Sequence, residues 1–282
     1  MSLVPTGDLV GRAAAERGCV AAFNVITLEH AEGIVTGAEA AGRPVILQIS
    51  ENAVRYHGGR LAPLALAASS MAGSAAVEVA LHLDHVTDTG LLHQAADAGF
   101  SSVMFDAGAL SHADNLAATA SAARWAHGAG LWIEAELGYV GGKPDSPASA
   151  HADGVRTDPA EASAYVADTG VDALAVAVGS SHAMTERSAS LDHALIARLR
   201  EAVPVPLVLH GSSGVPDTDL RAAVLAGMAK INIGTALNVA LTRTVREVLD
   251  GKPALTDPRK YLGPAREAVA VTVREMLAVL AP

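Results

Sequence analysis

The sequence predicts an α/β protein folded as a single (β/α)8 barrel over residues 1–282, with an additional helix at the C-terminus. Three observations lead to this prediction. Eight short apolar runs alternate with stretches of helical periodicity, which is typical of a parallel sheet. Nearly every run ends in a polar residue, as barrel strands do at an active site. No glycine-rich dinucleotide loop follows the first run, which disfavours the rival, an open doubly wound sheet.

The expected strands are the apolar runs themselves. In chain order they are Val20–Asn24, Val45–Ser50, Val79–His85, Ser101–Asp106, Leu131–Glu136, Ala173–Val178, Pro206–His210 and Lys230–Ile233. The sixth run lacks a polar end, but Gly179-Ser180-Ser181-His182 supplies polar groups just beyond it. The polar strand ends could simply reflect the general polarity of loops. That explanation suits the Ser and Asn residues at these positions, but it suits the Asp-His pair, the Glu and the two further histidines less well.

Helical patterns fill the intervals between these strands. The expected helices are Glu29–Ala41, Leu61–Val77, Leu91–Ala98, Asn115–His127, Pro159–Thr169, His193–Ala202 and Thr218–Ala226. Start signals precede two of them, Thr157-Asp158-Pro159 and Pro216-Asp217. The segment that begins at Leu61 carries no charge, but it is rich in small residues, contains Pro63 and is short for a bilayer, so we expect a helix packed on the sheet.

Residues 138–157 form a long connection without clear periodicity, which begins Gly-Tyr-Val-Gly-Gly-Lys-Pro. Structureless connections longer than about 12–15 residues are uncommon in compact domains and often close over an active site. Because this one follows directly after Glu136, the sequence favours an active-site lid over a disordered surface insertion.

Composition excludes several classes of protein. The chain has 282 residues, of which 50% are hydrophobic, so it is not intrinsically disordered. Its one cysteine, Cys19, excludes a disulfide framework and a cysteine-based zinc ribbon. The formal net charge of −10 argues against nucleic-acid binding, which needs a basic face. No signal peptide pattern opens the chain, so the sequence predicts a cytoplasmic protein without membrane attachment.

Three histidines mark a candidate metal site. His85, His182 and His210 lie at or just beyond the ends of three different strands, and in a barrel these ends converge on one mouth. Three neutral imidazoles around one point make a catalytic zinc site with an open fourth position. The alternative is three histidines that are satisfied independently; within a barrel, the metal site is favoured.

Carboxylates accompany these histidines. Asp84 directly precedes His85, and a carboxylate beside zinc can exchange a proton with a substrate hydroxyl. Alternatively, Asp84 only orients a histidine. Asp106 and Glu136 are candidates for supporting the metal ligands or for a second cation position. Glu134 shares the face of Glu136 and is expected to be buried structure.

Two glycine-containing turns follow the last two strands, His210-Gly-Ser-Ser-Gly214 and Asn232-Ile-Gly-Thr235, and both lead into helices. Turns at these places are the usual phosphate site of a barrel, because glycine lets backbone N–H groups approach the anion. A metal and a carboxylate beside a bound phosphate ester suit aldol cleavage or isomerisation through an enediolate.

The lysines argue against the competing Schiff-base route, which needs a lysine pointing into the barrel. Lys143 falls in the expected lid, and Lys252 and Lys260 fall in the C-terminal connection and helix. Lys230 starts the eighth expected strand, so we expect it at the end of the barrel away from the site. The metal-dependent route is therefore favoured.

An ordered set of short runs extends over nearly the whole chain. The runs are Leu83-Asp-His85, Ser102-Val-Met-Phe-Asp106, Glu134-Ala-Glu-Leu-Gly138, Ala175-Val-Ala-Val-Gly-Ser-Ser-His182, Leu209-His-Gly-Ser-Ser-Gly214, Lys230-Ile-Asn-Ile-Gly-Thr235 and Asp257-Pro-Arg-Lys-Tyr-Leu262. Together they resemble the class II, zinc-dependent fructose/tagatose-bisphosphate aldolases, and as an ordered set they are highly specific.

The resemblance implies a role for each matched residue. His85, His182 and His210 would hold the catalytic zinc, Asp84 would be the acid/base for the substrate hydroxyl, and Asn232 would contact the enediolate. Further positions would line the substrate pocket or surround the phosphate of dihydroxyacetone phosphate and an associated monovalent cation, Na⁺ or K⁺: Asn24, Gln48, Ser50, Gly179, Gly211, Ser213 and Thr235.

The chain departs from the family pattern at the lid and after the second histidine. The family lid usually reads Gly-Gly-x-Glu-Asp, and its Glu exchanges the carbon-bound proton of dihydroxyacetone phosphate. Here Pro144 occupies the place of that Glu, and because Pro cannot transfer a proton, either Asp145 or another group substitutes for it. Ala183 stands where the family has Gly, and Glu186 stands where it often has Lys, so ketoses other than fructose 1,6-bisphosphate are also candidates for the preferred substrate.

The sequence therefore predicts a metal-dependent aldolase of carbohydrate metabolism, such as glycolysis. It would reversibly cleave fructose 1,6-bisphosphate, tagatose 1,6-bisphosphate or a related ketose phosphate to dihydroxyacetone phosphate and an aldehyde, through a zinc-stabilised enediolate. The alternatives are a metal-dependent ketose-phosphate isomerase or epimerase, and a sugar-phosphate-binding barrel without turnover. A homodimer or homotetramer is expected. The candidates for a distal phosphate contact, left unranked, are Arg55, Arg187 and Arg259.

Overall fold

The computed structural model describes residues 2–138 and 156–281. Eight parallel strands close into a barrel in chain order, which confirms the predicted (β/α)8 architecture. The strands are β1 (Val20–Asn24), β2 (Val45–Ser50), β3 (Val79–Val86), β4 (Ser102–Phe105), β5 (Trp132–Leu137), β6 (Ala173–Val176), β7 (Leu207–Leu209) and β8 (Met228–Ile233). Each begins and ends within two residues of its expected bounds.

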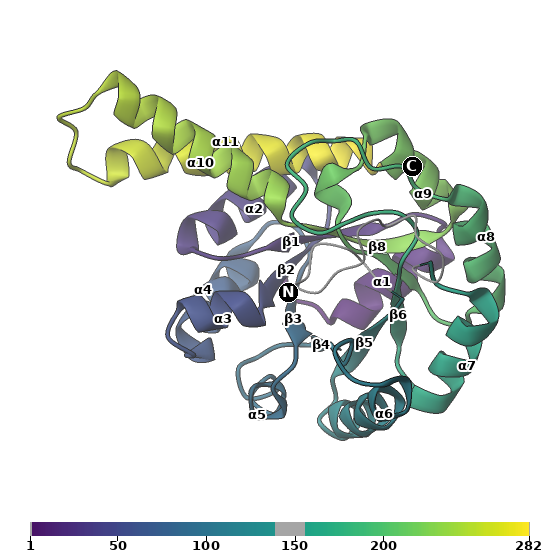
Figure 1. The fold of residues 1–282 in the computed structure, drawn as a ribbon. Helices are drawn as coiled ribbons and strands as arrows, with labels where there is room; N and C mark the ends of the chain where they lie inside the picture. Colours follow the sequence, from purple (N-terminus) through teal and green to yellow (C-terminus); the bar gives the residue numbers. More distant parts are fainter. Residues whose placement is uncertain (1, 139–155, 282) are drawn as a thin grey trace.

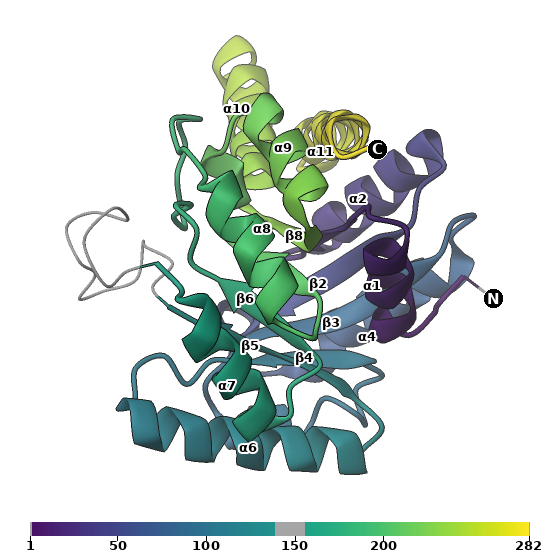
Figure 2. The same ribbon diagram turned by 90° about the vertical axis from the view of Figure 1, so that its right-hand side faces the viewer.

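Helices form a layer around the barrel (Figure 1), and α7, α8 and α9 run alongside the strands in the turned view (Figure 2). The helices are α1 (Thr6–Ala15), α2 (Leu28–Ala41), α3 (Glu51–Tyr56), α4 (Leu61–Ser74), α5 (Thr89–Leu92), α6 (His112–Gly128), α7 (Pro159–Thr169), α8 (His193–Ala202), α9 (Asp217–Ala226), α10 (Thr235–Gly251) and α11 (Arg259–Val279). Among the described residues, no helix combines the length and the apolar character needed to cross a bilayer.

Alternation along each strand separates two buried environments. In β2, Val45, Leu47 and Ile49 pack in the large core between the strands and the helices. Ile46 and Gln48 point the other way, into the barrel. Because both faces of a barrel strand are covered, the strands are apolar along most of their length and turn polar toward their carboxyl ends.

Helix α1 closes the amino-terminal end of the barrel. Its Leu9 and Val10 pack against a layer of inward-facing residues that includes Val20, Ile46 and Ala229. All of these side chains are nearly or completely buried. The barrel interior is therefore sealed by apolar side chains at this end, and polar side chains occupy the other.

The expected start of α7 is confirmed in detail. The Asp158 side chain accepts hydrogen bonds from the backbone N–H groups of Ala160 and Glu161, and Pro159 fills the first turn. The helix ends at Gly170, whose φ of 71° lies in the left-handed region that glycine adopts easily.

Two expected boundaries are wrong. The helix expected over 91–98 ends as α5 at Leu92, and successive tight turns carry the chain on to Gly99. Strand β8 begins at Met228 rather than at Lys230, so Lys230 lies within the strand. Its side chain is completely buried inside the barrel, and its ammonium contacts side chains near the site, contrary to the expectation that it lies at the far end.

Helices α10 and α11 form a hairpin that projects from the barrel beside α2 (Figure 1). The contact between α2 and α11 depends on small residues. A Cβ atom added to Gly37 would lie 2.5 Å from the carbonyl oxygen of Ala270 and 2.7 Å from Cβ of Val273. Only glycine allows this approach of two helix backbones, which holds the base of the hairpin against the barrel.

Candidate active site

A cavity of about 670 Å³ opens at the carboxyl ends of the strands. The polar strand ends singled out in the sequence meet there. The predicted site residues that line the cavity are Asn24, Gln48, Ser50, Asp84, His85, Asp106, His182, Gly211, Ser213, Asn232 and Thr235. Asp145, together with most of the expected lid, lies outside the described residues.

Asp84 and His85 both face the cavity although they are neighbours in a strand. Residues next to each other in a regular strand point to opposite faces. Here His85 has a φ of 49°, and the pairing of β3 with β4 shifts register between Leu83 and Val86. This local break in the strand turns two successive polar side chains toward one mouth.

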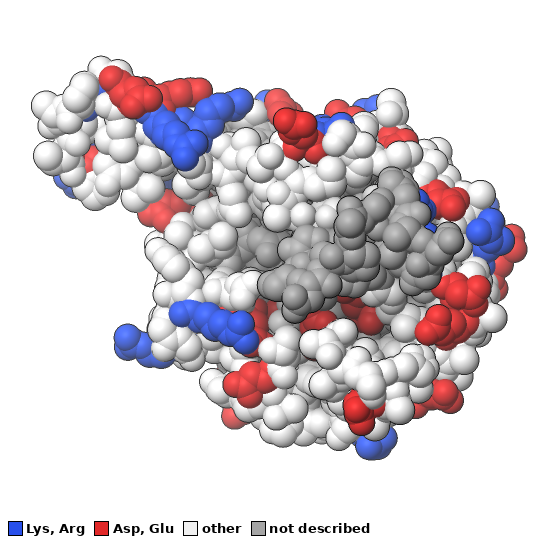
Figure 3. All heavy atoms as spheres, viewed as in Figure 1, with Lys and Arg blue, Asp and Glu red and all other residues white. Residues whose placement is uncertain are grey.

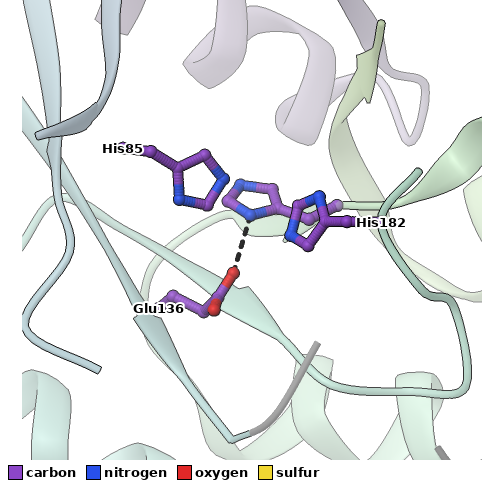
Figure 4. Close-up of side chains that lie close together, drawn as sticks. His85, Glu136 and His182 are labelled. Atoms are coloured by element: carbon purple, nitrogen blue, oxygen red, sulfur yellow. Dashed lines mark hydrogen bonds and ion pairs between the residues drawn. The ribbon is translucent and has the colours of Figure 1, made fainter. Parts of the chain in front are cut away.

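Four side chains from separate strands and loops form a candidate metal centre: His85, Glu136, His182 and His210. Each offers one ligand atom, and these atoms all lie within 4.8 Å of one another. The ring centroids of the three histidines are 4.9–5.7 Å apart. Figure 4 shows His85, Glu136 and His182 converging on the same space. Three imidazoles and a carboxylate form a donor set that suits Zn²⁺.

Carboxylates orient two of these imidazoles. His85 donates from Nδ1 to Oδ2 of Asp106 over 2.9 Å, which leaves Nε2 for a metal. His210 lies between two glutamates, with Nδ1 2.8 Å from Oε2 of Glu136 and Nε2 2.9 Å from Oε1 of Glu134. Glu134 is not part of the ligand cluster, so Nε2 of His210, its partner, points away from the cluster. Nδ1 of His210 is therefore the nitrogen that faces the ligand cluster.

The buried carboxylates shape the protonation of this centre. Burial lowers the pKa of His210, but hydrogen bonds to Glu134 and Glu136 outweigh burial and raise it to about 9 in the metal-free protein. Burial alone would raise the pKa of Asp84, yet the charges of His85 and other nearby cationic groups outweigh it and lower the pKa. Asp84 is therefore ionised at neutral pH, as a proton acceptor must be.

Gln48 fixes the carboxylate of Asp84. Its Nε2 donates to Oδ2 of Asp84 over 3.2 Å and to Oδ1 of Asn24 over 2.8 Å. All three side chains line the cavity and come from successive strands. The amide thus joins two residues of the pocket wall and holds them in register.

The two glycine turns lie side by side on another wall of the cavity. The first passes through a short helical turn, η1 (Ser212–Gly214), and the second leads into α10. Ser213 Oγ accepts a hydrogen bond from the backbone N–H of Ala236, which joins the two turns. Gly211 has a φ of 67°, and an added Cβ would lie 2.6 Å from backbone atoms of Ser181, so only glycine fits there.

Gly179, Glu136 and His210 do not line the cavity. Gly179 has a structural reason to be glycine, because its φ is 121° and an added Cβ would lie 2.4 Å from the carbonyl oxygen of Ser190. Glu136 and His210 are almost completely buried beneath the cavity wall. Their contribution to the site is therefore through the ligand cluster.

The three arginines considered for a distal phosphate lie in different places. Arg55 lines the cavity and pairs with Glu51 on α3. Arg187 donates to the carbonyl oxygen of Val215, and Arg259 is highly exposed at the start of α11. Basic side chains on the described surface of this face stand in separate small groups rather than in one continuous stripe (Figure 3).

Sequence reasoning found only part of a second polar layer beneath the site: it expected Glu134 to be buried, but it did not consider His82 and it misplaced Lys230. His82, Glu134 and Lys230 are completely buried inside the barrel. Each lies two residues before a predicted site residue on its strand, so period-two alternation could have placed it inside. Another missed residue is Glu51, which accepts hydrogen bonds from Thr87 and Asp88 at the cavity rim.

Comparison with known proteins agrees with this geometry. A family model described as fructose-bisphosphate aldolase class-II matches residues 4–281. The chain belongs to the class II fructose-bisphosphate aldolases. The fructose-bisphosphate aldolase of Geobacillus stearothermophilus is 38% identical over 274 residues, which cover 97% of this chain and 95% of that protein. A probable fructose-bisphosphate aldolase of Bacillus subtilis (strain 168) is 40% identical over 275 residues, with the same coverage.

A solved structure supports the same assignment. The YdjI aldolase from Escherichia coli K12 superposes on this chain with a TM-score of 0.86 at 32% identity, covering 99% of this chain and 97% of that one. As a class II aldolase the chain is an enzyme of the lyase class, which confirms the resemblance drawn from the motifs. The isomerase and the barrel without turnover are thereby set aside.

Proposed function

We propose that this class II aldolase reversibly cleaves a ketose phosphate to dihydroxyacetone phosphate and an aldehyde, with Zn²⁺ as its metal. One observation carries the proposal: Asp84, the cluster members His85 and His182, and the turns at Gly211 and Thr235 all line one cavity. A proton acceptor, a metal centre and a phosphate site within one pocket are what aldol cleavage of a phosphorylated ketose requires.

The metal would be held by the cluster of three histidines and one carboxylate: His85, Glu136, His182 and His210. When bound, it supplies a Lewis acid that stabilises the negative charge left on the substrate oxygens after cleavage. Asp106 accepts a hydrogen bond from Nδ1 of His85, and Glu134 accepts one from Nε2 of His210. Such outer hydrogen bonds fix the ring orientation and the tautomer of a ligating histidine.

Asp84 is the proposed base for cleavage. It accepts the proton of the hydroxyl on the carbon that becomes the aldehyde, and the electron pair of the broken carbon–carbon bond passes to the dihydroxyacetone phosphate half. Its lowered pKa keeps it ionised for this step. Gln48 fixes one of its carboxylate oxygens, so the base is held in place before the substrate arrives.

The remaining pocket residues have proposed binding roles. Asn232 would donate a hydrogen bond to an oxygen of the enediolate, and Asn24 and Ser50 would contact the sugar. The phosphate and a monovalent cation, Na⁺ or K⁺, would lie against the turns that contain Gly179, Gly211, Ser213 and Thr235. Asp145 in the lid would return the proton to carbon in place of the family Glu.

The contact for the distal end of the substrate is proposed from the lining of the cavity. Arg55 is the only one of the three candidate arginines that lines the described cavity, so we propose it as the contact for a distal phosphate. A homodimer or homotetramer also stays a proposal, as does a place in glycolytic carbohydrate metabolism.

Solvent-deuterium exchange into dihydroxyacetone phosphate tests the proposal without knowledge of the aldehyde. We expect zinc-dependent exchange that a chelator abolishes and that His182→Asn prevents. Asp168→Ala, a substitution on the exposed side of α7, serves as the matched control and should leave exchange unchanged. A zinc-loaded protein that neither exchanges this proton nor cleaves any ketose phosphate would rule the proposal out.

A further inference from the structure

Lys230 carries an ammonium group buried in the centre of the barrel. Its side chain has no solvent exposure, and Nζ lies 2.8 Å from Oε2 of Glu134 and 2.8 Å from Oδ1 of Asn232. Glu134 belongs to β5, whereas Lys230 and Asn232 lie two residues apart on β8 and face the same side. One cation thus connects a carboxylate on one strand with an amide on another.

The chemistry of the ammonium decides how the Asn232 amide is turned. An ammonium has three donors and no acceptor, so only the amide oxygen can face it. The amide nitrogen must then point away from Lys230. Asn232 lines the cavity, and no residue in the described part of the chain accepts a hydrogen bond from its nitrogen. Lys230 therefore leaves a hydrogen-bond donor available at the cavity wall.

The second partner of Lys230 supports the metal centre. Oε2 of Glu134 accepts from Lys230, and Oε1 of the same carboxylate accepts from Nε2 of His210 over 2.9 Å. Both carboxylate oxygens are therefore engaged, and the pair is completely buried. The ion pair keeps the carboxylate charged beneath His210, where a lone buried charge would be costly.

We propose that Lys230 is a positioning residue that holds the Asn232 amide with its nitrogen toward the substrate. This inference rests on the proposed function, in which Asn232 donates to the enediolate. Lys230 never touches the substrate and forms no covalent bond with it; it acts through Asn232. A purely structural ion pair would affect stability, but it would not single out the step that Asn232 assists.

The test removes both members of the buried ion pair, because Glu134→Gln alone leaves the Lys230 ammonium buried without its carboxylate partner. Glu134→Gln neutralises the carboxylate and keeps an acceptor for His210, and Lys230→Met in that background removes only the ammonium. Zinc content and thermal stability are measured for each protein. Lys252→Met, a substitution of an exposed lysine at the end of α10, is the matched control and should change neither kcat nor KM.

Removal of the ammonium should lower kcat for ketose phosphate cleavage by about tenfold to a hundredfold, with little change in KM, because a transition-state donor is no longer held in place. Asn232→Ala should then cost little in the Glu134→Gln, Lys230→Met background, although it lowers kcat strongly in the wild type. If Asn232→Ala lowers kcat by the same factor in both backgrounds, the two residues act independently and the inference is overturned.

A second readout separates this inference from the proposed function. The ¹³C signal of the Asn232 side-chain carbonyl, identified by its loss in Asn232→Ala, reports the hydrogen bond from Lys230 without any activity. We expect it to shift when Lys230→Met is introduced into the Glu134→Gln background. An unchanged signal overturns the inference even in an active enzyme. If Lys230→Met shifts the signal but the wild-type protein cleaves no ketose phosphate, the orientation of Asn232 is supported while the proposed function fails.

Discussion

Nδ1 of His85 lies 2.9 Å from Oδ2 of Asp106, across the ends of β3 and β4. The carboxylate fixes the tautomer of His85 and turns Nε2 toward the ligand cluster. Asp106→Ala should therefore weaken zinc binding by about 10- to 100-fold. Competition with a chromogenic chelator measures the affinity directly, and Asp168→Ala is the control. Unchanged zinc affinity would assign Asp106 a role other than orienting His85.

Asp84→Asn removes the proposed base while it keeps the shape of the side chain. The amide can still accept a hydrogen bond from Gln48, so the pocket should stay intact. Loss of a general base typically costs about 10²- to 10⁴-fold in rate, and we expect kcat to fall within that range. Zinc content, measured by atomic absorption, should equal that of the wild type. A variant that retains most of its kcat would require a different base.

His82 should make the fold sensitive to acid. Burial, together with the charge of Lys230, lowers the pKa of His82 to about 3, whereas an unfolded histidine titrates near 6.5. Because protonation favours the unfolded chain, the stabilisation is present above about pH 6.5 and is lost as the pH falls from there toward 3. The slope contributed by this one group is about 1.4 kcal/mol per pH unit.

Urea unfolding of the metal-free protein at several pH values checks this prediction. The free energy of unfolding of His82→Gln should depend less steeply on pH between about 6 and 4 than that of the wild type. All other groups are common to the two proteins, so their contributions cancel in the difference. Equal slopes would mean that His82 is protonated in the folded state, contrary to its burial.

Arg55→Met should distinguish substrates by their distal phosphate. The guanidinium lies at the cavity rim, where Glu51 positions it. Because Arg55 is largely exposed, its loss should raise KM for fructose 1,6-bisphosphate by only about 5- to 30-fold. KM for fructose 1-phosphate, which lacks the second phosphate, should not change. Arg124→Met on α6 is the control, and equal effects on both substrates would exclude a distal phosphate contact.

Ala183→Gly should widen the phosphate side of the pocket. Ala183 lines the cavity next to His182 with a φ of 58°, a conformation that costs a residue with a side chain about 1 kcal/mol. Glycine relieves that strain but loses more entropy on folding, so the free energy of unfolding should change by less than about 1 kcal/mol. We expect a lower KM for dihydroxyacetone phosphate in proton exchange.

Arg17→Gly provides the matched comparison for Ala183→Gly. Arg17 has a φ of 57° and lies at the end of α1, away from the cavity. Its replacement should relieve the same kind of backbone strain and leave KM unchanged. If both variants shifted KM equally, the effect at position 183 would come from general flexibility and not from the missing methyl group.

Much of the fold was open to prediction because strand alternation is a local property. The apolar runs at Val45 and Ala173 are strands because buried barrel strands need apolar side chains on both faces. The helix expected over 91–98 was wrong beyond Leu92. The apolar spacing of this segment is compatible with a helix, but the chain continues in tight turns after Leu92. Local pattern does not determine where such a short helix stops.

The candidate site was predictable where chemistry and position coincided. His85, His182 and His210 stood out because metal-binding residue types occurred at strand ends. Lys230 was misplaced because its expected strand began too late, and a shift of two residues changes the depth of a side chain within the barrel. Its contact with Glu134 joins β8 to β5, strands far apart in the chain, so no local pattern reveals it.

The sequence by itself determined the architecture, and it singled out His85, His182, His210 and Asp84 as candidate site residues, since these follow from residue type and periodicity. The tertiary structure decided which nitrogen of His85 and His210 faces the cluster, how Asp84 and His85 share one mouth, and what Lys230 touches. These relationships depend on closure of the barrel. Closure brings strands far apart in the chain within hydrogen-bond distance, and only the packed structure records their register.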